Sequence, residues 1–281
     1  MKPASPLPPP SLRPLLPCAA ALALLAAGAA QAEEPLWELG AGATVLRLPH
    51  YRGADQSHTW TLPLPYVVYR GPILRADREG ARAVLLQTDR LDVDLSLSGT
   101  PPTRSSDNVA RRGMADLPTI VELGPLVSWT AARGDDWKLD LRLPVRAALG
   151  VGSEGGFKGW VATPQLRLSL PQAGGWRTAL YGALVAQDRR YNEVFYKVSA
   201  SEATPDRPAY QPGGGRAGGY LQGVASRRFG PWWVAGFARW DTLRGASFLD
   251  SPLVRQRENW SAGIAVAYVF ATSSREGQAE E

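Results

Sequence analysis

The segment 137–149 alternates between apolar and mostly charged side chains. Its odd-numbered positions, from Trp137 to Leu149, are all apolar, whereas four of its even-numbered positions are charged: Lys138, Asp140, Arg142 and Arg146. Successive side chains of a strand point to opposite faces, so this segment predicts a strand with one apolar and one charged face. Such a strand suits a sheet between hydrocarbon and water, and the pattern recurs along the chain. The sequence therefore predicts an all-β fold, an antiparallel transmembrane β-barrel of the outer-membrane type.

The N-terminal residues 1–32 have the features of a secretory signal peptide. Lys2 and Arg13 precede an apolar stretch, and Ala30-Gln31-Ala32 supplies small residues at a cleavage site after Ala32. No later stretch approaches the roughly 20 apolar residues of a membrane-spanning helix. The only cysteine, Cys18, lies in the signal peptide, so the mature chain is expected to have no disulfide and no thiol chemistry.

Charge and motifs argue against several functional classes. Removal of Lys2 and Arg13 lowers the formal net charge from +5 to +3, and no basic cluster with interleaved aromatic residues indicates nucleic-acid binding. The sequence contains no zinc-ligand spacing, no Gly-rich phosphate loop and no nucleophile elbow. We therefore expect no catalytic residue, no metal and no cofactor.

About twelve strands are predicted within residues 33–270, and 271–281 form a polar, acidic tail. The predicted strands are 37–46, 58–69, 72–76, 80–87, 90–99, 118–131, 137–150, 159–170, 176–187, 217–229, 232–242 and 259–270. Links after even-numbered strands are short, whereas most links after odd-numbered strands are longer. Bacterial barrels have short periplasmic turns and longer external loops, so both chain ends are expected on the periplasmic side.

The tryptophans support the barrel over a soluble β-sandwich or lipocalin. Nearly all lie close to a predicted strand end, where two aromatic girdles at the headgroup level would place them. Trp60 is among those assigned to the external girdle. A soluble core would not concentrate tryptophan at strand ends.

Several motifs, in order and spacing, make the chain resemble the MipA/OmpV family of outer-membrane proteins. They are Pro49-His50-Tyr51-Arg52-Gly53, Pro63-Leu64-Pro65-Tyr66-Val67-Val68-Tyr69-Arg70-Gly71, Gly113-Met114-Ala115-Asp116-Leu117, Glu122-Leu123-Gly124, Arg190-Tyr191-Asn192-Glu193-Val194-Phe195-Tyr196-Lys197-Val198-Ser199, Ala209-Tyr210, Gly213-Gly214-Gly215, Asp250-Ser251-Pro252-Leu253-Val254 and Tyr268-Val269-Phe270. Two departures are Lys197, where the family usually has Gly, and the tail after Phe270.

This resemblance implies a barrel in the outer membrane of a Gram-negative cell, in contact with outer-membrane lipid. The family is named for a scaffold that binds a lytic transglycosylase and a murein synthase, and other members are described as porin-like or adhesive. We therefore expect a non-enzymatic scaffold for murein-remodelling enzymes. A porin-like channel for small solutes is the first alternative. The second alternative is an outer-rim enzyme that acts on lipid through His50 and His58, with Asp55 and Ser57 nearby. The competing interpretation is that these are ordinary polar residues of a loop.

Inward-facing charges are the candidate lumen residues. They are Lys138, Asp140, Arg142, Arg146, Arg167 and Glu122, with Asp92 and Asp94 on a further strand. Buried charges must pair or stay hydrated. A paired network would close the lumen, whereas a hydrated, net-basic wall would make a narrow channel with some anion preference.

The long loop 188–216 carries the candidate contact residues Tyr191, Phe195, Tyr196 and Tyr210. Exposed aromatic residues beside arginines suit a binding surface. They equally suit a loop folded into the barrel mouth as a plug. The tail 271–281 is the longest predicted periplasmic segment and is the candidate contact for an envelope partner.

Overall fold

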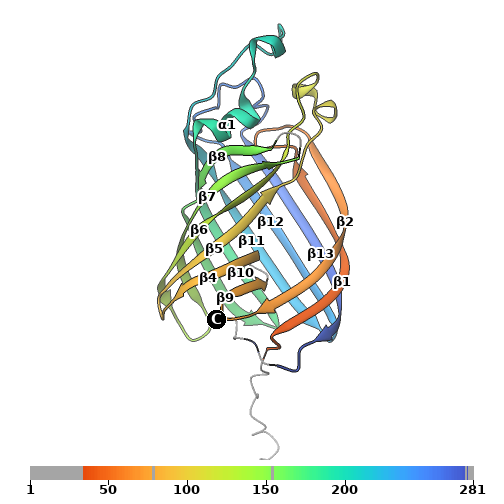
Figure 1. The fold of residues 1–281 in the computed structure, drawn as a ribbon, viewed down its shortest axis with the longest axis vertical. Helices are drawn as coiled ribbons and strands as arrows, with labels where there is room; N and C mark the ends of the chain where they lie inside the picture. Colours follow the sequence, from red (N-terminus) through yellow and green to blue (C-terminus); the bar gives the residue numbers. More distant parts are fainter. Residues whose placement is uncertain (1–33, 78–79, 153–154, 276, 278–281) are drawn as a thin grey trace, which may run out of the picture.

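A computed structural model describes residues 34–77, 80–152, 155–275 and 277, and the predicted signal peptide lies outside these residues. The chain forms one closed antiparallel sheet, which confirms the predicted barrel (Figure 1). The first and last strands, β1 and β13, pair from Glu38 with Thr272 to Arg47 with Ala262, and this pairing closes the barrel. No described helix has the length and apolarity that crossing a membrane requires.

The described residues contain thirteen strand segments. They are β1 (Trp37–Pro49), β2 (Ser57–Arg70), β3 (Leu74–Asp77), β4 (Gly80–Gln87), β5 (Leu91–Thr100), β6 (Thr119–Arg133), β7 (Lys138–Val151), β8 (Gly156–Ala162), β9 (Gln165–Ala173), β10 (Trp176–Gln187), β11 (Gly215–Phe229), β12 (Trp232–Thr242) and β13 (Glu258–Thr272).

Two of these segments share one position in the barrel wall. Both β8 and β9 pair with β7 on one side and with β10 on the other. Pro164 lies between them, and a proline has no N–H with which to continue a ladder. The predicted strand 159–170 is therefore interrupted, and the barrel has the twelve strand positions that were predicted.

The alternation of β7 separates lipid-facing from lumen-facing residues as the sequence predicts. Leu141 and Leu143 are about two-fifths exposed on the outer surface, whereas Asp140 and Arg142 line an internal cavity. Leucine side chains on the outer face are stabilised by contact with hydrocarbon, whereas exposing the same side chains to water would be unfavourable.

The two ends of the barrel differ in the length of their connections. Tight turns and the first and last described segments, near Glu34 and Arg275, lie at the end we call periplasmic (Figure 1). The opposite, external end carries four long loops, 50–56, 101–118, 188–214 and 243–257, which we call the plug. The plug contains the helices η1 (Ser105–Asp107), η2 (Val109–Arg111), α1 (Arg189–Tyr196) and η3 (Ala200–Glu202). The sequence did not predict these helices.

The start of the predicted tail is part of the barrel. β13 continues to Thr272, and the following residues pair with the N-terminal segment. Ser273 N donates to Trp37 O at 2.9 Å, Leu36 N to Arg275 O at 2.8 Å, and Gly277 N to Glu34 O at 2.8 Å. We call the paired segments 34–37 and 271–275 the terminal ribbon.

The wall is incomplete between β2 and β5. β3 is only four residues long and pairs with β2 through Tyr69 and Arg70 alone. Residues 57–68 of β2 pair with β1 on one side and with no described strand on the other. Above the short β3–β4 hairpin, β2 and β5 stand apart (Figure 1).

Candidate functional site

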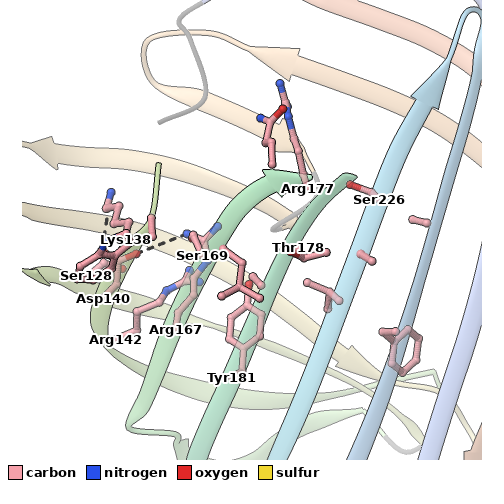
Figure 2. Close-up of a pocket in the computed structure, with 18 of the residues that line it drawn as sticks. Ser128, Lys138, Asp140, Arg142, Arg167, Ser169, Arg177, Thr178, Tyr181 and Ser226 are labelled. Atoms are coloured by element: carbon pink, nitrogen blue, oxygen red, sulfur yellow. Dashed lines mark ion pairs between the residues drawn. The ribbon is translucent and has the colours of Figure 1, made fainter. Parts of the chain in front are cut away.

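The lower lumen contains a cavity of about 790 Å³ near the periplasmic end. Eight basic and five acidic side chains line it. Of the predicted lumen charges, Lys138, Asp140, Arg142 and Arg167 point into it (Figure 2). Its wall is therefore net basic, which favours anionic over cationic solutes.

Asp140 is the best-buried acid of this cavity, with only 3% of its surface exposed. Lys138 Nζ lies 3.8 Å and Arg167 Nη1 3.7 Å from its carboxylate, on the two sides of the residue (Figure 2). Thr130 Oγ1 donates to the same carboxylate at 3.1 Å. On the neighbouring wall, Arg82 Nε lies 4.0 Å from Asp94. Part of the basic wall is therefore paired.

Two further predicted lumen charges, Glu122 and Arg146, lie nearer the external end. Glu122 is buried and accepts a hydrogen bond at 2.8 Å from the phenol of Tyr191, which belongs to α1 of the plug. Arg146 Nε donates to Ser96 Oγ at 3.0 Å. Glu122 thus ties the plug to the wall.

The plug has a hydrophobic core of its own. Tyr191, Phe195 and Tyr196 are 3–7% exposed, and Tyr210 packs against them. Tyr196 stacks on Phe248 with ring centroids 3.7 Å apart. The structure thus places the four loop candidates inside the plug, which is the arrangement that the plug interpretation describes.

Burial also shifts the acidity of the plug phenols. Tyr51 Oη donates to Leu253 O at 2.8 Å, and burial raises its pKa to about 12. Burial likewise raises the pKa of Tyr196, whose phenol donates to Arg52 O at 2.8 Å. Both phenols therefore stay protonated at neutral pH and act as hydrogen-bond donors.

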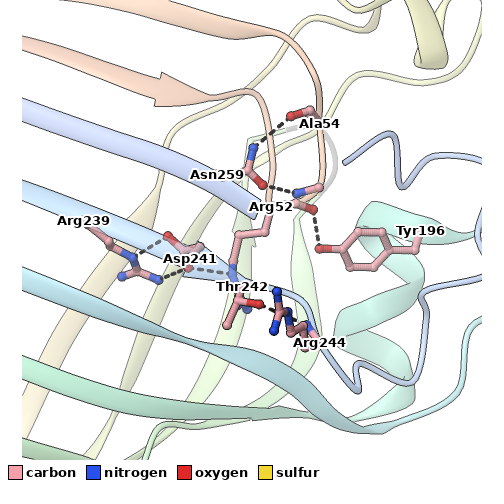
Figure 3. A network of polar contacts seen from close by, with 9 residues as sticks. Arg52, Ala54, Tyr196, Arg239, Asp241, Thr242, Arg244 and Asn259 are labelled. Carbon is pink, nitrogen blue, oxygen red and sulfur yellow. Dashed lines mark hydrogen bonds and ion pairs between the residues drawn. The ribbon is translucent and has the colours of Figure 1, made fainter. Parts of the chain in front are cut away.

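Two strand residues anchor the first loop of the plug to the wall (Figure 3). Asn259 of β13 accepts from Gly53 N at 2.6 Å and donates to Ala54 O at 2.9 Å. Asp241 of β12, 2% exposed, binds Arg52 Nε at 2.9 Å and Arg239 Nη2 at 2.7 Å. Gly53 has φ +95°, and a Cβ there would lie 2.9 Å from Leu243 Cδ1, so the turn requires glycine.

A second cavity, of about 920 Å³, lies beneath the plug. His58 and Trp60 of β2 line it on one side, and His50, Tyr191 and Tyr196 line it from the plug. The rings of Trp60 and His58 are in tilted contact, with centroids 4.4 Å apart, on the lumen side of β2. The assignment of Trp60 to a lipid-facing girdle is therefore wrong.

The geometry of the histidines differs from that of a catalytic pair. The His50 Nδ1–Asn108 Nδ2 distance is 3.1 Å, and Asn108 Oδ1 accepts from Arg111 N, so the amide presents its NH₂ to the ring. Within the described residues neither histidine hydrogen-bonds a serine or a carboxylate, and no group of three or more potential metal ligands occurs. Burial lowers the pKa of His50, so it is neutral at pH 7.

An ion-pair cluster that the sequence did not indicate lies at the periplasmic end. Arg70 binds Glu34 at 2.8 Å and Glu38 at 2.9 Å. Arg177 of β10 also binds Glu34, at 2.7 Å, and Arg228 of β11 binds Glu38. The cluster holds the terminal ribbon against strands from opposite parts of the wall.

The sequence analysis did not identify the residues that anchor the plug, and one reason applies to all of them. Arg52 stands in a motif, but Asp241 and Asn259 are isolated polar residues near strand ends, and nothing local marks their partners. The Asn259–Gly53 contact spans 206 residues of sequence.

No curated protein sequence matches the chain. Among solved structures, a bacterial polysaccharide outer membrane secretin is similar over 85% of this chain and 99% of its own, with 8% identity and a TM-score of 0.40. The CymD monoaromatic hydrocarbon channel is similar over 85% and 90%, with 12% identity and a TM-score of 0.39. At these values neither similarity carries a conclusion about activity. The family model described as MltA-interacting protein MipA matches residues 39–270, nearly the whole described barrel, and the chain therefore belongs to the MipA family.

Proposed function

We propose that this protein is a non-enzymatic scaffold in the outer membrane, and that its periplasmic end binds a murein-remodelling enzyme of the lytic transglycosylase class, alone or with a murein synthase. The observation that carries the proposal is the family membership, whose description names an interaction with MltA. The geometry supports it in two ways.

The first support is the plug. Its fully buried side chains include Phe248, Leu243, Leu253, Asn108 and Asn192. A loop cluster packed this well excludes solutes from the external mouth better than a mobile loop does. A barrel with a packed mouth suits a binding role better than bulk transport.

The second support is the terminal ribbon. Most periplasmic turns are too short to offer a large surface, whereas the ribbon adds further residues at this end and is held by backbone hydrogen bonds. Four ion pairs join it and the start of β1 to β2, β10 and β11. A rigid surface loses little conformational entropy on binding, which favours affinity.

Binding to a purified lytic transglycosylase tests the proposal. The full mature chain is held in lipid nanodiscs, and its affinity is compared with that of a chain truncated after Thr272. The matched control is Arg207→Ala in the plug, where Arg207 donates to Ala110 O on the external side. We expect the truncation to weaken binding about tenfold or more, since the ribbon supplies much of the periplasmic surface, and the control to leave it unchanged. Absence of binding by the unaltered protein would refute the proposal.

A second candidate function, a small-solute channel, is favoured by one observation. The lower cavity is lined by more cations than anions and is large enough for a small organic anion. If this function holds, Arg142→Glu changes the ion selectivity of the measured current, because it reverses a charge on the cavity wall.

A further inference from the structure

Two prolines of β2, Pro63 and Pro65, explain why one edge of this strand pairs with no described strand. The ladder between β1 and β2 runs without a register shift through Ala43–Pro63 and Ala41–Pro65. An antiparallel ladder of this kind needs N–H donors on the side facing β1, and proline has none. The nitrogens of Pro63 and Pro65 must therefore face away from β1, toward the open side. Prolines in such positions prevent a further strand from pairing there.

The second cavity, which lies beneath the plug and which we call the upper cavity, has lining residues on this edge of β2. Its lining includes His58 and Trp60 of β2, and Gly99 and Thr100 at the end of β5. These two segments are the opposite borders of the gap between β2 and β5. β5 pairs with β4 only as far as Ser96, so its last residues also lack a described partner on that side. The lining of this cavity therefore includes residues from both borders of the gap.

The lumen wall beside the gap is apolar, unlike the charged wall of β7. Leu62 and Leu64 of β2 pair with Thr44 and Gly42 of β1, and Thr44 lines the lower cavity. Paired residues of an antiparallel ladder share a face, so both leucines point into the lumen. Leu62 is 41% exposed there.

Two more side chains extend this surface across the barrel. Leu46 and Phe237 line the lower cavity, and Phe237 lines the upper one as well. A Cβ atom at Gly263 would lie 2.5 Å from Leu46 Cδ2 and 2.6 Å from Phe237 Cε1, so the two side chains meet over this glycine. We call Leu46, Leu62, Leu64 and Phe237 the lumen apolar patch. Barrel interiors are usually polar, and an exposed apolar patch marks a binding surface.

We propose that the gap between β2 and β5 is a lateral portal, and that the acyl chain of a bilayer lipid enters through it and lies on the lumen apolar patch. Three observations fit this occupant. The portal opens within the lipid-facing wall, where Val67 of β2 and Leu97 of β5 are exposed on the flanking strands. The patch runs from β2 at the portal to β12. A hydrocarbon chain on the patch would also cover Leu46 and Phe237, which line the lower cavity.

Photolabelling with residue resolution tests the portal. The mature protein is reconstituted in vesicles of a phosphatidylethanolamine that carries a diazirine at the end of one acyl chain, irradiated, and mapped by mass spectrometry. Inward and outward residues alternate along each strand, so labels report the side directly. We expect labels on Leu62, Leu64 or Phe237 in addition to the outward-facing Ile264, which shows that the probe has reacted. Labels confined to outward-facing residues would overturn the proposal.

A paired variant tests the role of the patch. Leu62→Ser with Leu64→Ser should reduce the label on Phe237 about tenfold, because serine cannot supply the apolar contact area of leucine. The matched control is Tyr181→Ser, which changes another residue of the lower cavity on β10, separated from Phe237 by β11, and it should leave that label unchanged. Full labelling of Phe237 in the double variant would refute the path along the patch. The label on Ile264 checks that each variant has inserted, and neither result depends on a periplasmic partner.

Discussion

Replacing Asn259 with leucine should release the first loop of the plug while leaving the barrel intact. The side chain is 2% exposed, and its amide satisfies both Gly53 N–H and Ala54 C=O. Leucine has a similar volume but satisfies neither group. An unsatisfied buried polar group costs about 1–3 kcal/mol, so the two together lower the local stability of the loop by roughly 3 kcal/mol.

This magnitude can be measured by hydrogen exchange. A loss of about 3 kcal/mol in the opening free energy accelerates exchange of the Gly53 amide by about two orders of magnitude. The segment at Arg255 should also exchange faster, since Arg255 N donates to Gly53 O at 2.7 Å. The control is Ala262→Leu, an outward-facing change on the same strand. If Gly53 exchanged equally fast in both variants, the argument that Asn259 clamps the plug would be refuted.

Three further predictions concern charge. Lowering the pH from 7.5 to 5 should increase trypsin cleavage at Arg52. Burial lowers the pKa of His50 in the folded protein below the 6.5 of the unfolded chain, so folding favours the neutral imidazole. The loop therefore keeps its full stability above pH 6.5 and loses stability as the pH falls from 6.5 through the folded pKa. His50→Gln should remove that pH dependence, and equal cleavage of the unaltered protein at both pH values would contradict the explanation. Asp241→Asn should lower the temperature at which the folded band is lost on a gel, since removing one partner of a buried ion pair costs about 3 kcal/mol; an unchanged temperature would argue against the Arg52–Asp241–Arg239 network. Glu38→Gln should make the terminal ribbon easier to digest with a carboxypeptidase, because Arg70 and Arg228 lose their shared carboxylate, and unchanged digestion would show that the ion pairs do not hold it.

The barrel could be predicted from sequence because its determinants are local. The side chains of β7 alternate because one face meets water and the other meets hydrocarbon, so neighbouring residues in the sequence reveal the strand. The break at Pro164 shows the limit of that reasoning, since β8 and β9 continue the same apolar alternation across it.

The orientation of β2 was harder to predict for a related reason. Both of its faces are largely apolar, so alternation alone does not show which face meets lipid. Its register with β1 does: Trp60 pairs with Leu46 on the lumen side. The same ambiguity concealed the lumen apolar patch.

The plug contacts could not be predicted, because they join loops that are distant in sequence. Tyr196 stacks on Phe248, and Ser251 Oγ donates to Tyr196 O at 2.8 Å across 55 residues. Composition indicates that such a loop carries aromatic residues. Only the fold shows that Tyr191, Phe195 and Tyr196 are buried.

Single-channel conductance of the refolded mature protein in a planar bilayer tests the central claim, a plugged barrel that serves as a scaffold, most directly. Folding is first confirmed by the gel shift on heating. The account predicts no reproducible current steps from folded protein, because the packed plug covers the external mouth. Reproducible steps whose ion selectivity changes in Arg142→Glu would contradict it and would show an open, solute-conducting lumen.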